Sequence, residues 1–239
     1  EIVFGDIRDY NLIKNISKNC DHILHLAALI GIPYSYTAVE SYIDVNIKGT
    51  QNVLRASIEN NIKSFIHTST SEVYGTAQYS PMDEKHPLVA QSPYSATKIA
   101  ADNLVYSFNR SFNLKSFIVR PFNTFGPRQS SRAVIPTIIL QALKGNIIKL
   151  GKVDATRDFT YVEDTCSAFL EVLKNDKLFG EIINVGSNNE ISIKNIINLV
   201  FDKLDINKKI EIVKLRKRPN KSEVDRLVCD NTKIIKNTN

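Results

Sequence analysis

Short apolar runs alternate along the chain with longer stretches in which hydrophobic residues recur at helical spacing. Runs of strand length lie at residues 21–26, 63–68, 115–119 and 181–185, and residues 1–6 have the pattern of the last part of another strand. The helical stretches lie at about residues 9–18, 38–60, 93–113, 131–144, 162–174 and 191–204. This alternation predicts an α/β fold, a doubly wound parallel sheet with helices on both faces.

Ligands of such sheets bind at the carboxyl ends of the strands. The residues directly after the apolar runs are therefore the first candidates for a site: Gly5 and Asp6, Ala27 and Ala28, Thr68 to Glu72, and Arg120 to Gly126. The segment Thr68-Ser-Thr-Ser-Glu72 places a group of hydroxyls and one carboxylate at a single strand end.

Tyr94 and Lys98 are four residues apart at the start of a predicted helix and therefore share a face. A lysine ammonium beside a phenol favours the phenolate, which would lower the pKa of Tyr94 toward the range of a general base. The spacing alone is not specific, because Tyr10 and Lys14 have it too. The pair gains weight from its position after the strand that ends in Thr68 to Glu72.

Composition and charge exclude several classes of protein. The 239 residues, with 43% hydrophobic and 23% charged residues, are typical of a folded protein with one large domain or two interlocked ones. No apolar run approaches the roughly 20 residues of a membrane span, and no signal peptide is evident, so we expect a cytoplasmic protein without a membrane partner. The net charge of +6 is densest at Lys214–Arg218, which lacks aromatic residues and favours a solvated or diphosphate-facing patch over a nucleic-acid surface.

The cysteines Cys20, Cys166 and Cys229 lie far apart and lack the spacing of metal ligands. We interpret them as buried thiols in a reducing compartment. His22 and His25 would lie on opposite faces of a strand, so we predict no metal site there either.

Several further blocks follow one another in a fixed order. They are His25-Leu-Ala-Ala28, Asn46-Ile-Lys-Gly-Thr50, Thr68-Ser-Thr-Ser-Glu-Val-Tyr-Gly75, Tyr94-Ser-Ala-Thr-Lys98, Arg120-Pro-Phe-Asn-Thr-Phe-Gly-Pro-Arg128, Arg157-Asp-Phe-Thr-Tyr-Val-Glu-Asp164 and Ile183-Asn-Val-Gly186. In this order they resemble the extended short-chain dehydrogenase/reductases, the family of NAD-dependent sugar-nucleotide epimerases and dehydratases.

The resemblance implies a Rossmann-type sheet with NAD as cofactor and a nucleotide-diphosphate sugar as substrate. Asp6 and Ile7 would lie by the adenine, and Leu26, Ala27 and Ala28 along the ribose and diphosphate. Thr68 and Ser69 would flank the nicotinamide ribose. The other implied cofactor contacts are Asn46, Tyr94 and Lys98.

The implied substrate contacts are Asn123, Arg157 and Arg218. Asn123 would contact a phosphate, and Arg157 would pair with the diphosphate, a task that suits the planar fork of an arginine. The alternative for Arg157 is a surface pair with Asp164 that caps a helix.

The block Thr70-Ser71-Glu72 narrows the reaction. Simple 4-epimerases of the family resemble it at the leading hydroxyl but commonly lack the glutamate. A 4,6-dehydratase needs a carboxylate to remove the C5 proton after C4 has been oxidised, and Glu72 is placed for that role. Many dTDP-glucose dehydratases have an aspartate where this chain has Ser71. Serine is a poor acid, so Glu72 or a water would have to help the C6 hydroxyl leave.

Other reactions remain open. A UDP-glucuronate decarboxylase shares the Thr70-Ser71-Glu72 block, a UDP-sugar 4-epimerase shares the C4 oxidation, and a binding module of the same fold would not catalyse at all. The segments 28–36, 91–94 and 130–136 look like the 4,6-dehydratases of UDP- or GDP-N-acetylglucosamine in bacterial surface-sugar biosynthesis. We therefore favour a 4,6-dehydratase, a hydro-lyase.

No two glycines lie three residues apart, so the glycine-rich turn that meets a pyrophosphate is missing. We therefore expect a Rossmann-type domain over residues 1–122, without its first βαβ unit and rejoined by 158–186. A smaller C-terminal substrate-binding region, itself truncated, would comprise 123–157 and 187–239. Residues 1–239 alone should bind NAD poorly. The helices near 38–60 and 93–113 are those that pair subunits in the family, which implies a homodimer.

Overall fold

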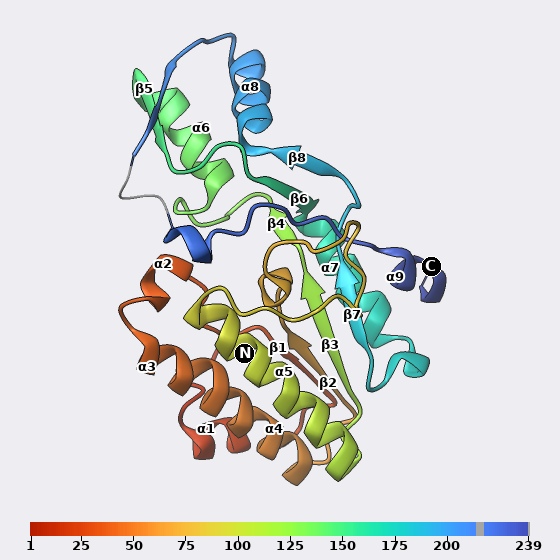
Figure 1. The fold of residues 1–239 in the computed structure, drawn as a ribbon. Coiled ribbons are helices and arrows are strands. Elements are labelled where there is room, and N and C mark those ends of the chain that lie inside the picture. The colour runs from red at the N-terminus through yellow and green to blue at the C-terminus, as the bar shows by residue number, and fades with distance from the viewer. Residues whose placement is uncertain (214–217, 239) are drawn as a thin grey trace.

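A computed structural model describes residues 1–213 and 218–238. The four internal apolar runs form a parallel sheet in the order β1-β2-β3-β7, with β1 at His22–His25, β2 at Ser64–Thr68, β3 at Ser116–Pro121 and β7 at Ile182–Val185 (Figure 1). The strands pair in register, so that Leu24 lies beside Ile66 and Ile66 beside Phe117. The structure confirms the predicted α/β fold with a parallel sheet.

Helices cover both faces of this sheet (Figure 1). On one face lie α1 (Tyr10–Ile16), α4 (Thr50–Glu59) and α5 (Pro93–Phe112). On the other lie α7 (Val162–Leu173) and α9 (Thr232–Asn237).

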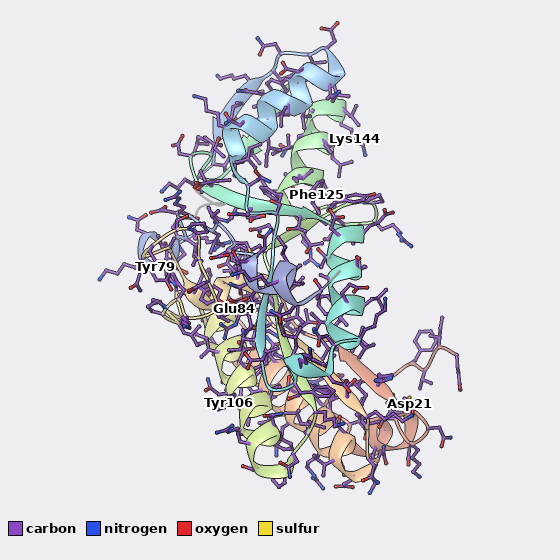
Figure 2. The ribbon with its side chains drawn as sticks, turned by 90° about the vertical axis from the view of Figure 1, so that its right-hand side faces the viewer. Asp21, Tyr79, Glu84, Tyr106, Phe125 and Lys144 are labelled. Atoms are coloured by element: carbon purple, nitrogen blue, oxygen red, sulfur yellow. The ribbon has the colours of Figure 1, made fainter. Side chains whose placement is uncertain are left out.

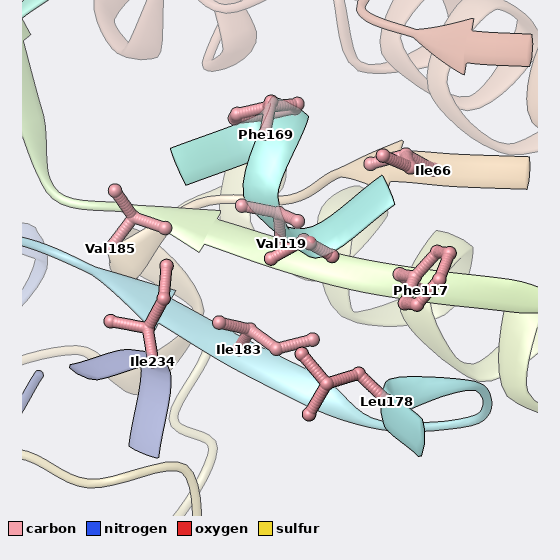
Figure 3. Close-up of a cluster of buried hydrophobic side chains, with 9 residues drawn as sticks. Ile66, Phe117, Val119, Phe169, Leu178, Ile183, Val185 and Ile234 are labelled. Atoms are coloured by element: carbon pink, nitrogen blue, oxygen red, sulfur yellow. The ribbon is translucent and has the colours of Figure 1, made fainter. Parts of the chain in front are cut away.

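Alternation along the strands divides the core between the two faces. In β2, Phe65 packs with the cluster on the side of α4 and α5, whereas Ile66 packs with the cluster that includes Phe169 of α7 (Figure 3). Both faces are therefore buried, which explains why the strands read as continuous apolar runs rather than alternating ones.

A second core lies at the far end of the molecule. It joins α6 (Val134–Lys144) and α8 (Ile193–Leu204) to the two-stranded sheet of β5 (Ile147–Leu150) and β9 (Lys209–Ile212). A third sheet, β4-β6-β8, lies between this core and the main sheet and consists of Asn123–Phe125, Thr156–Tyr161 and Glu190–Ser192 (Figure 1). Figure 2 shows Lys144 of α6 in this far part, with Asp21 and Tyr106 at the opposite end. The domain boundaries given above stay a prediction.

The segment of residues 218–230 returns from the second core to the main sheet. It contains the short 3-10 helix Asn220–Ser222. Leu227 and Cys229 are buried against Tyr74 and Met82, and Cys229 forms a parallel bridge with Met82. We call residues 218–230 the return segment.

Some local expectations were wrong. Residues 1–6 form no strand: they pair with no other strand, and Phe4 is 94% exposed. A strand forms only where its backbone groups find a hydrogen-bonded neighbour. The stretch 38–60 is not one α-helix but α3 (Val39–Tyr42), a π-helical segment (Ile43–Gly49) and α4. The short elements α2 (Ile32–Ser35), β4, β5, β6, β8, β9 and the 3-10 helices Ser71–Tyr74 and Asp176–Leu178 were not predicted.

The cysteines also differ from expectation. Cys229 is buried, but Cys20 and Cys166 are exposed, and all three are free thiols. Cys20 follows the short helix α1, and Cys166 lies on the exposed side of α7, whose buried side carries Phe169. No helix in the described part of the chain is long and apolar enough to cross a membrane.

Candidate active site

The carboxyl end of β2 leads directly into a tight turn that carries the predicted catalytic block. Thr70 caps the 3-10 helix Ser71–Tyr74, because its side-chain oxygen accepts a hydrogen bond from the backbone N–H of Glu72 at 3.2 Å. Gly75 ends the turn at φ 66°, where a Cβ would lie 2.8 Å from the carbonyl oxygen of Val89. The turn thereby fixes Glu72 just beyond the strand end.

Helix α5 brings Tyr94 to the same place. The helix begins in a capping box, in which Ser92 and Ser95 exchange hydrogen bonds, and Pro93 occupies its first turn. Tyr94 is buried, and its ring meets the ring of Tyr42 edge-on at 6.3 Å between centroids. The structure therefore gathers Thr70, Glu72 and Tyr94 at one strand end.

Burial raises the pKa of Tyr94 above its ordinary value. A hydrogen bond with Thr70 opposes this effect, and the negative charge of Glu72 adds to it. The expected lowering of this pKa by Lys98 is wrong for this structure, since desolvation of the phenol dominates. Lys98 instead directs its ammonium at the end of β2, where Nζ donates to the carbonyl oxygen of Thr68 at 2.7 Å.

Lys98 is itself buried, and desolvation lowers its pKa to about 8 while the charge of Asp102 opposes the fall. Its Nζ also lies 3.4 Å from Nε2 of His67. Lys98 and Tyr94 therefore share the helix face that the sequence predicted.

The ends of β1 and β2 have the features that a dinucleotide needs. Oγ1 of Thr68 is buried and has no hydrogen-bond partner among the described residues. Leu26 is 61% exposed just after β1, and the small residues Ala27 and Ala28 follow it. These observations fit NAD at this edge of the sheet.

Other predicted cofactor residues have partners within the chain. Asn46 lies in the π-helical segment. Its side chain accepts a hydrogen bond from the backbone N–H of Leu29 and donates to the carbonyl oxygen of Leu29 and to Oγ1 of Thr97, so it connects the loop after β1 to α5. Asp6 is exposed, and hydrogen bonds from Arg8 lower its pKa to about 2. Ile7 packs on Gly49, where a Cβ would approach it to 2.4 Å.

The predicted substrate residues lie on the third sheet and on the return segment. Arg218 pairs with Glu72, with 3.2 Å between Nη1 and Oε2. Arg157 on β6 is buried and lies 3.9 Å from Glu223, not beside Asp164, so the alternative of a surface pair is wrong. The remaining residues of the basic patch, Lys214–Lys217, lie outside the described residues.

A cavity with several charged side chains in its lining adjoins Arg218. It has a volume of about 480 Å³ and is lined by Lys152, Val153, Asp154, Ile212, Arg218, Asn220, Glu223 and Asp225. Asn123 lies on β4 with its Oδ1 buried and without a partner among the described residues, so it too can accept a hydrogen bond from a ligand. A cavity of about 520 Å³ at the amino ends of β1 to β3 contains none of the predicted site residues.

Sequence reasoning missed a buried polar network beneath the site. Oδ2 of Asp102 accepts hydrogen bonds from Ser69 at 2.9 Å and from Arg120 at 2.9 and 3.1 Å. Arg120 donates to the hydroxyl of Tyr74 at 3.0 Å, which donates to Asn184 at 2.7 Å. The available signal was an aspartate one helical turn after Lys98, on the same face of α5.

A sequence profile of the family described as GDP-mannose 4,6 dehydratase matches residues 1–239. The chain belongs to this family. Among relatives, the low-salt glycan biosynthesis protein Agl12 of Haloferax volcanii is 38% identical over 191 residues, which cover 80% of this chain and 61% of that protein. A dTDP-glucose 4,6-dehydratase of Streptomyces antibioticus is 30% identical, with 84% and 60% covered.

Solved structures of similar proteins have the same fold. DesIV, a dTDP-glucose 4,6-dehydratase from Streptomyces venezuelae with NAD and TYD bound, superimposes with a TM-score of 0.92 at 28% identity, covering 99% of this chain and 72% of that one. A UDP-glucuronic acid 4-epimerase from Bacillus cereus with UDP-glucuronic acid and NAD superimposes with a TM-score of 0.91 at 28% identity, covering 98% and 74%. The chain spans about three fifths of the length of the curated relatives named above.

Proposed function

We propose that the chain is the larger part of an NAD-dependent nucleotide-sugar 4,6-dehydratase. The observation that carries the proposal is the position of Glu72, which the turn after β2 holds close enough to Tyr94 for its charge to raise the pKa of the phenol. An epimerase needs only a base for the C4 hydroxyl, whereas dehydration also needs a base for the C5 proton. The names of the relatives agree with this proposal.

Tyr94 is the group that takes the proton of the C4 hydroxyl. Burial keeps the pKa of Tyr94 raised in this structure. Because positive charge near a phenol favours the phenolate, Lys98, one turn along α5, is the residue that would oppose this effect and assist the transfer. When bound, NAD would supply the hydride chemistry, accepting hydride from C4 and returning it to C6. Thr68 and Lys98 would hold it from the end of β2.

Glu72 then removes the C5 proton of the 4-keto sugar, and hydroxide leaves from C6 to give the alkene. The departing oxygen needs a proton, which the serine at position 71 is too weak an acid to give. Protonated Glu72 or a water supplies it, so one molecule of water is lost. A hydride to C6 and a proton to C5 complete the 4-keto-6-deoxy product.

Arg157, Arg218 and Asn123 would bind the diphosphate of the substrate. Both arginine side chains are largely buried, and there a guanidinium bonds strongly to phosphate oxygens. Arg218 would then exchange its partner Glu72 for the diphosphate, leaving the carboxylate free to act as a base.

We further propose a homodimer formed through the helical residues 39–59 and α5. Exposed apolar side chains support it: Val39 on α3, Ile43 in the π-helical segment and Tyr106 on α5. The cytoplasmic location and the weak NAD binding of residues 1–239 alone stay predictions from the sequence.

The test is product analysis with the full-length protein. UDP-N-acetylglucosamine, dTDP-glucose and GDP-mannose are each incubated with protein and NAD, and 4-keto-6-deoxy sugar is measured by mass spectrometry. Loss of 18 mass units from one of these substrates is the expected result. Carbon dioxide from UDP-glucuronate, inversion at C4 without loss of water, or binding without turnover would each overturn the proposal.

The second candidate is a 4-epimerase, favoured by the close superposition on the UDP-glucuronic acid 4-epimerase. Equal masses of substrate and product, with inversion at C4, would identify it.

A further inference from the structure

Lys98 lies above a buried carboxylate that the proposed chemistry does not use. Asp102 is one turn further along α5 and is 3% exposed. Its Oδ2 binds Ser69 and Arg120, and its Oδ1 lies 3.4 Å from Nε2 of His67. Beyond this contact, Oδ1 has no hydrogen-bond partner among the described residues, the His67 nitrogen included.

His67 lies between the carboxylate and the ammonium. Its Nε2 is 3.4 Å from both Nζ of Lys98 and Oδ1 of Asp102. Burial lowers the pKa of His67 to about 4, so the ring is neutral near pH 7. A neutral imidazole nitrogen either donates or accepts, so Nε2 cannot serve both neighbours at once.

The charges around Lys98 come from several elements. Asp102 on α5 is negative and Arg120 on β3 is positive, while His67 on β2 and His25 on β1 are held neutral by burial. Although burial by itself would raise the pKa of Asp102, the contact with His67 and the charge of Arg120 hold it below its ordinary value. Among the described groups that face Lys98, Asp102 is therefore the one that carries a negative charge.

We propose that Asp102 is a positioning residue that acts through Lys98 and Ser69. Its carboxylate is the buried counter-charge of the Lys98 ammonium, and it orients the Ser69 hydroxyl at the end of β2. The catalytic consequence rests on the proposed function, in which a charged Lys98 opposes the effect of burial on Tyr94 and assists proton transfer.

The direction of the effect follows from burial. Desolvation disfavours a lysine ammonium, and a nearby anion opposes that penalty. Without Asp102, Lys98 would keep the penalty and would also face Arg120 as an unpaired cation. Lys98 would then lose its proton at lower pH.

The experiment follows the ionisation of Lys98 directly in the full-length protein without substrate. With ¹³C-labelled lysine, the ε-carbon signal of Lys98 is assigned by its absence in the Lys98→Arg variant and titrated by NMR. We expect Asp102→Asn to lower the midpoint by at least about one pH unit. An unchanged midpoint would overturn the proposal.

A matched control separates charge from stability. Tyr74→Phe removes another hydrogen bond of Arg120 but leaves the carboxylate of Asp102 in place. It should lower the melting temperature and leave the Lys98 midpoint where it is. An equal fall of the midpoint in Tyr74→Phe would mean that loosening of the network, not charge, sets the ionisation.

Asp102→Asn leaves Arg120 buried and unpaired, which can prevent folding. In that case Asp102→Asn combined with Arg120→Gln removes both charges, and the midpoint should still fall. The alkaline limb of kcat/KM should move with the midpoint. A wild-type protein without dehydratase activity but with the NMR shift would refute the proposed function and leave this inference standing.

Discussion

At the scale of single residues, the site holds opposite charges close together on side chains that are largely buried. Glu72 faces Arg218, and Lys98 shares its buried surroundings with Asp102. Each removal of one partner leaves a charge that water cannot solvate, so single substitutions here change ionisation as well as contacts.

The clearest substitution is Glu72→Gln, which keeps the shape of the side chain but removes its basicity. We expect loss of water to slow by about 10²- to 10⁴-fold, while C4 oxidation continues and is seen as NADH absorbance that builds up and persists. Glu190→Gln is the control, because it also breaks a glutamate–arginine pair, an exposed one with Arg226. Normal dehydration by Glu72→Gln would contradict the role of Glu72.

His67 should make the protein sensitive to acid. Its pKa is about 4 in the folded protein, because of burial, and about 6.5 when unfolded. Between these values the unfolded chain binds more protons, so stability falls as the pH drops from 6.5 to 4, by about 3 kcal/mol in total. Urea unfolding at several pH values measures this slope. His67→Asn should reduce it; a variant that keeps the full slope would refute the assignment to His67.

At the scale of elements, α5 organises the site. It places Tyr94, Lys98 and Asp102 on one face, one turn apart. Its capping box fixes the residue at which the helix begins, and thereby the position of Tyr94 in the first turn. The π-helical segment Ile43–Gly49 plays a similar part, because it presents Asn46 to the backbone of Leu29 and to Thr97.

Ser92→Ala should therefore loosen the start of α5. Loss of a serine N-cap costs about 1 kcal/mol, which thermal unfolding can measure. The matched control is Ser107→Ala on the same helix, an exposed position whose hydroxyl bonds only to the carbonyl of Leu104 among the described residues. Equal losses in the two variants would show that the capping box adds nothing.

The sequence was informative where the structure is locally determined. The strands of the main sheet follow from apolar runs, and the block Thr70 to Glu72 lies at a strand end as expected. The short strands β4 and β8 were missed because three residues give no readable period. The pair of Glu72 and Arg218 spans 146 residues, and no local pattern encodes such a contact.

At the scale of the whole molecule, the return segment holds the two cores together. Leu227 and Cys229 pack against Tyr74 and Met82, which lie next to the main sheet. Arg226 forms a parallel backbone bridge with Thr156 of β6. Arg218 and Glu223, at the start of the same segment, reach Glu72 and Arg157. Stability and site assembly are therefore coupled through these residues.

Leu227→Ala tests this coupling. Leu227 is fully buried, so its truncation should cost about 2–5 kcal/mol. Urea unfolding of the variant should show a single transition, at a lower urea concentration than for the unmodified protein. One core should not unfold separately before the other. Leu199→Ala on the exposed side of α8 is the control and should cost far less. Two separate transitions in Leu227→Ala would mean that the cores are independent.

The return segment also sets an order of events during synthesis. The hydroxyl of Thr76 meets the carbonyl of Glu223, 147 residues later in the chain. A ribosome adding about 5–20 residues per second needs roughly 7–30 s to cover that interval. Throughout it, Val73 and Tyr74 have emerged without the residues that cover them. The nascent protein is therefore open to aggregation, and suited to a chaperone that shields apolar surface, until the return segment leaves the exit tunnel.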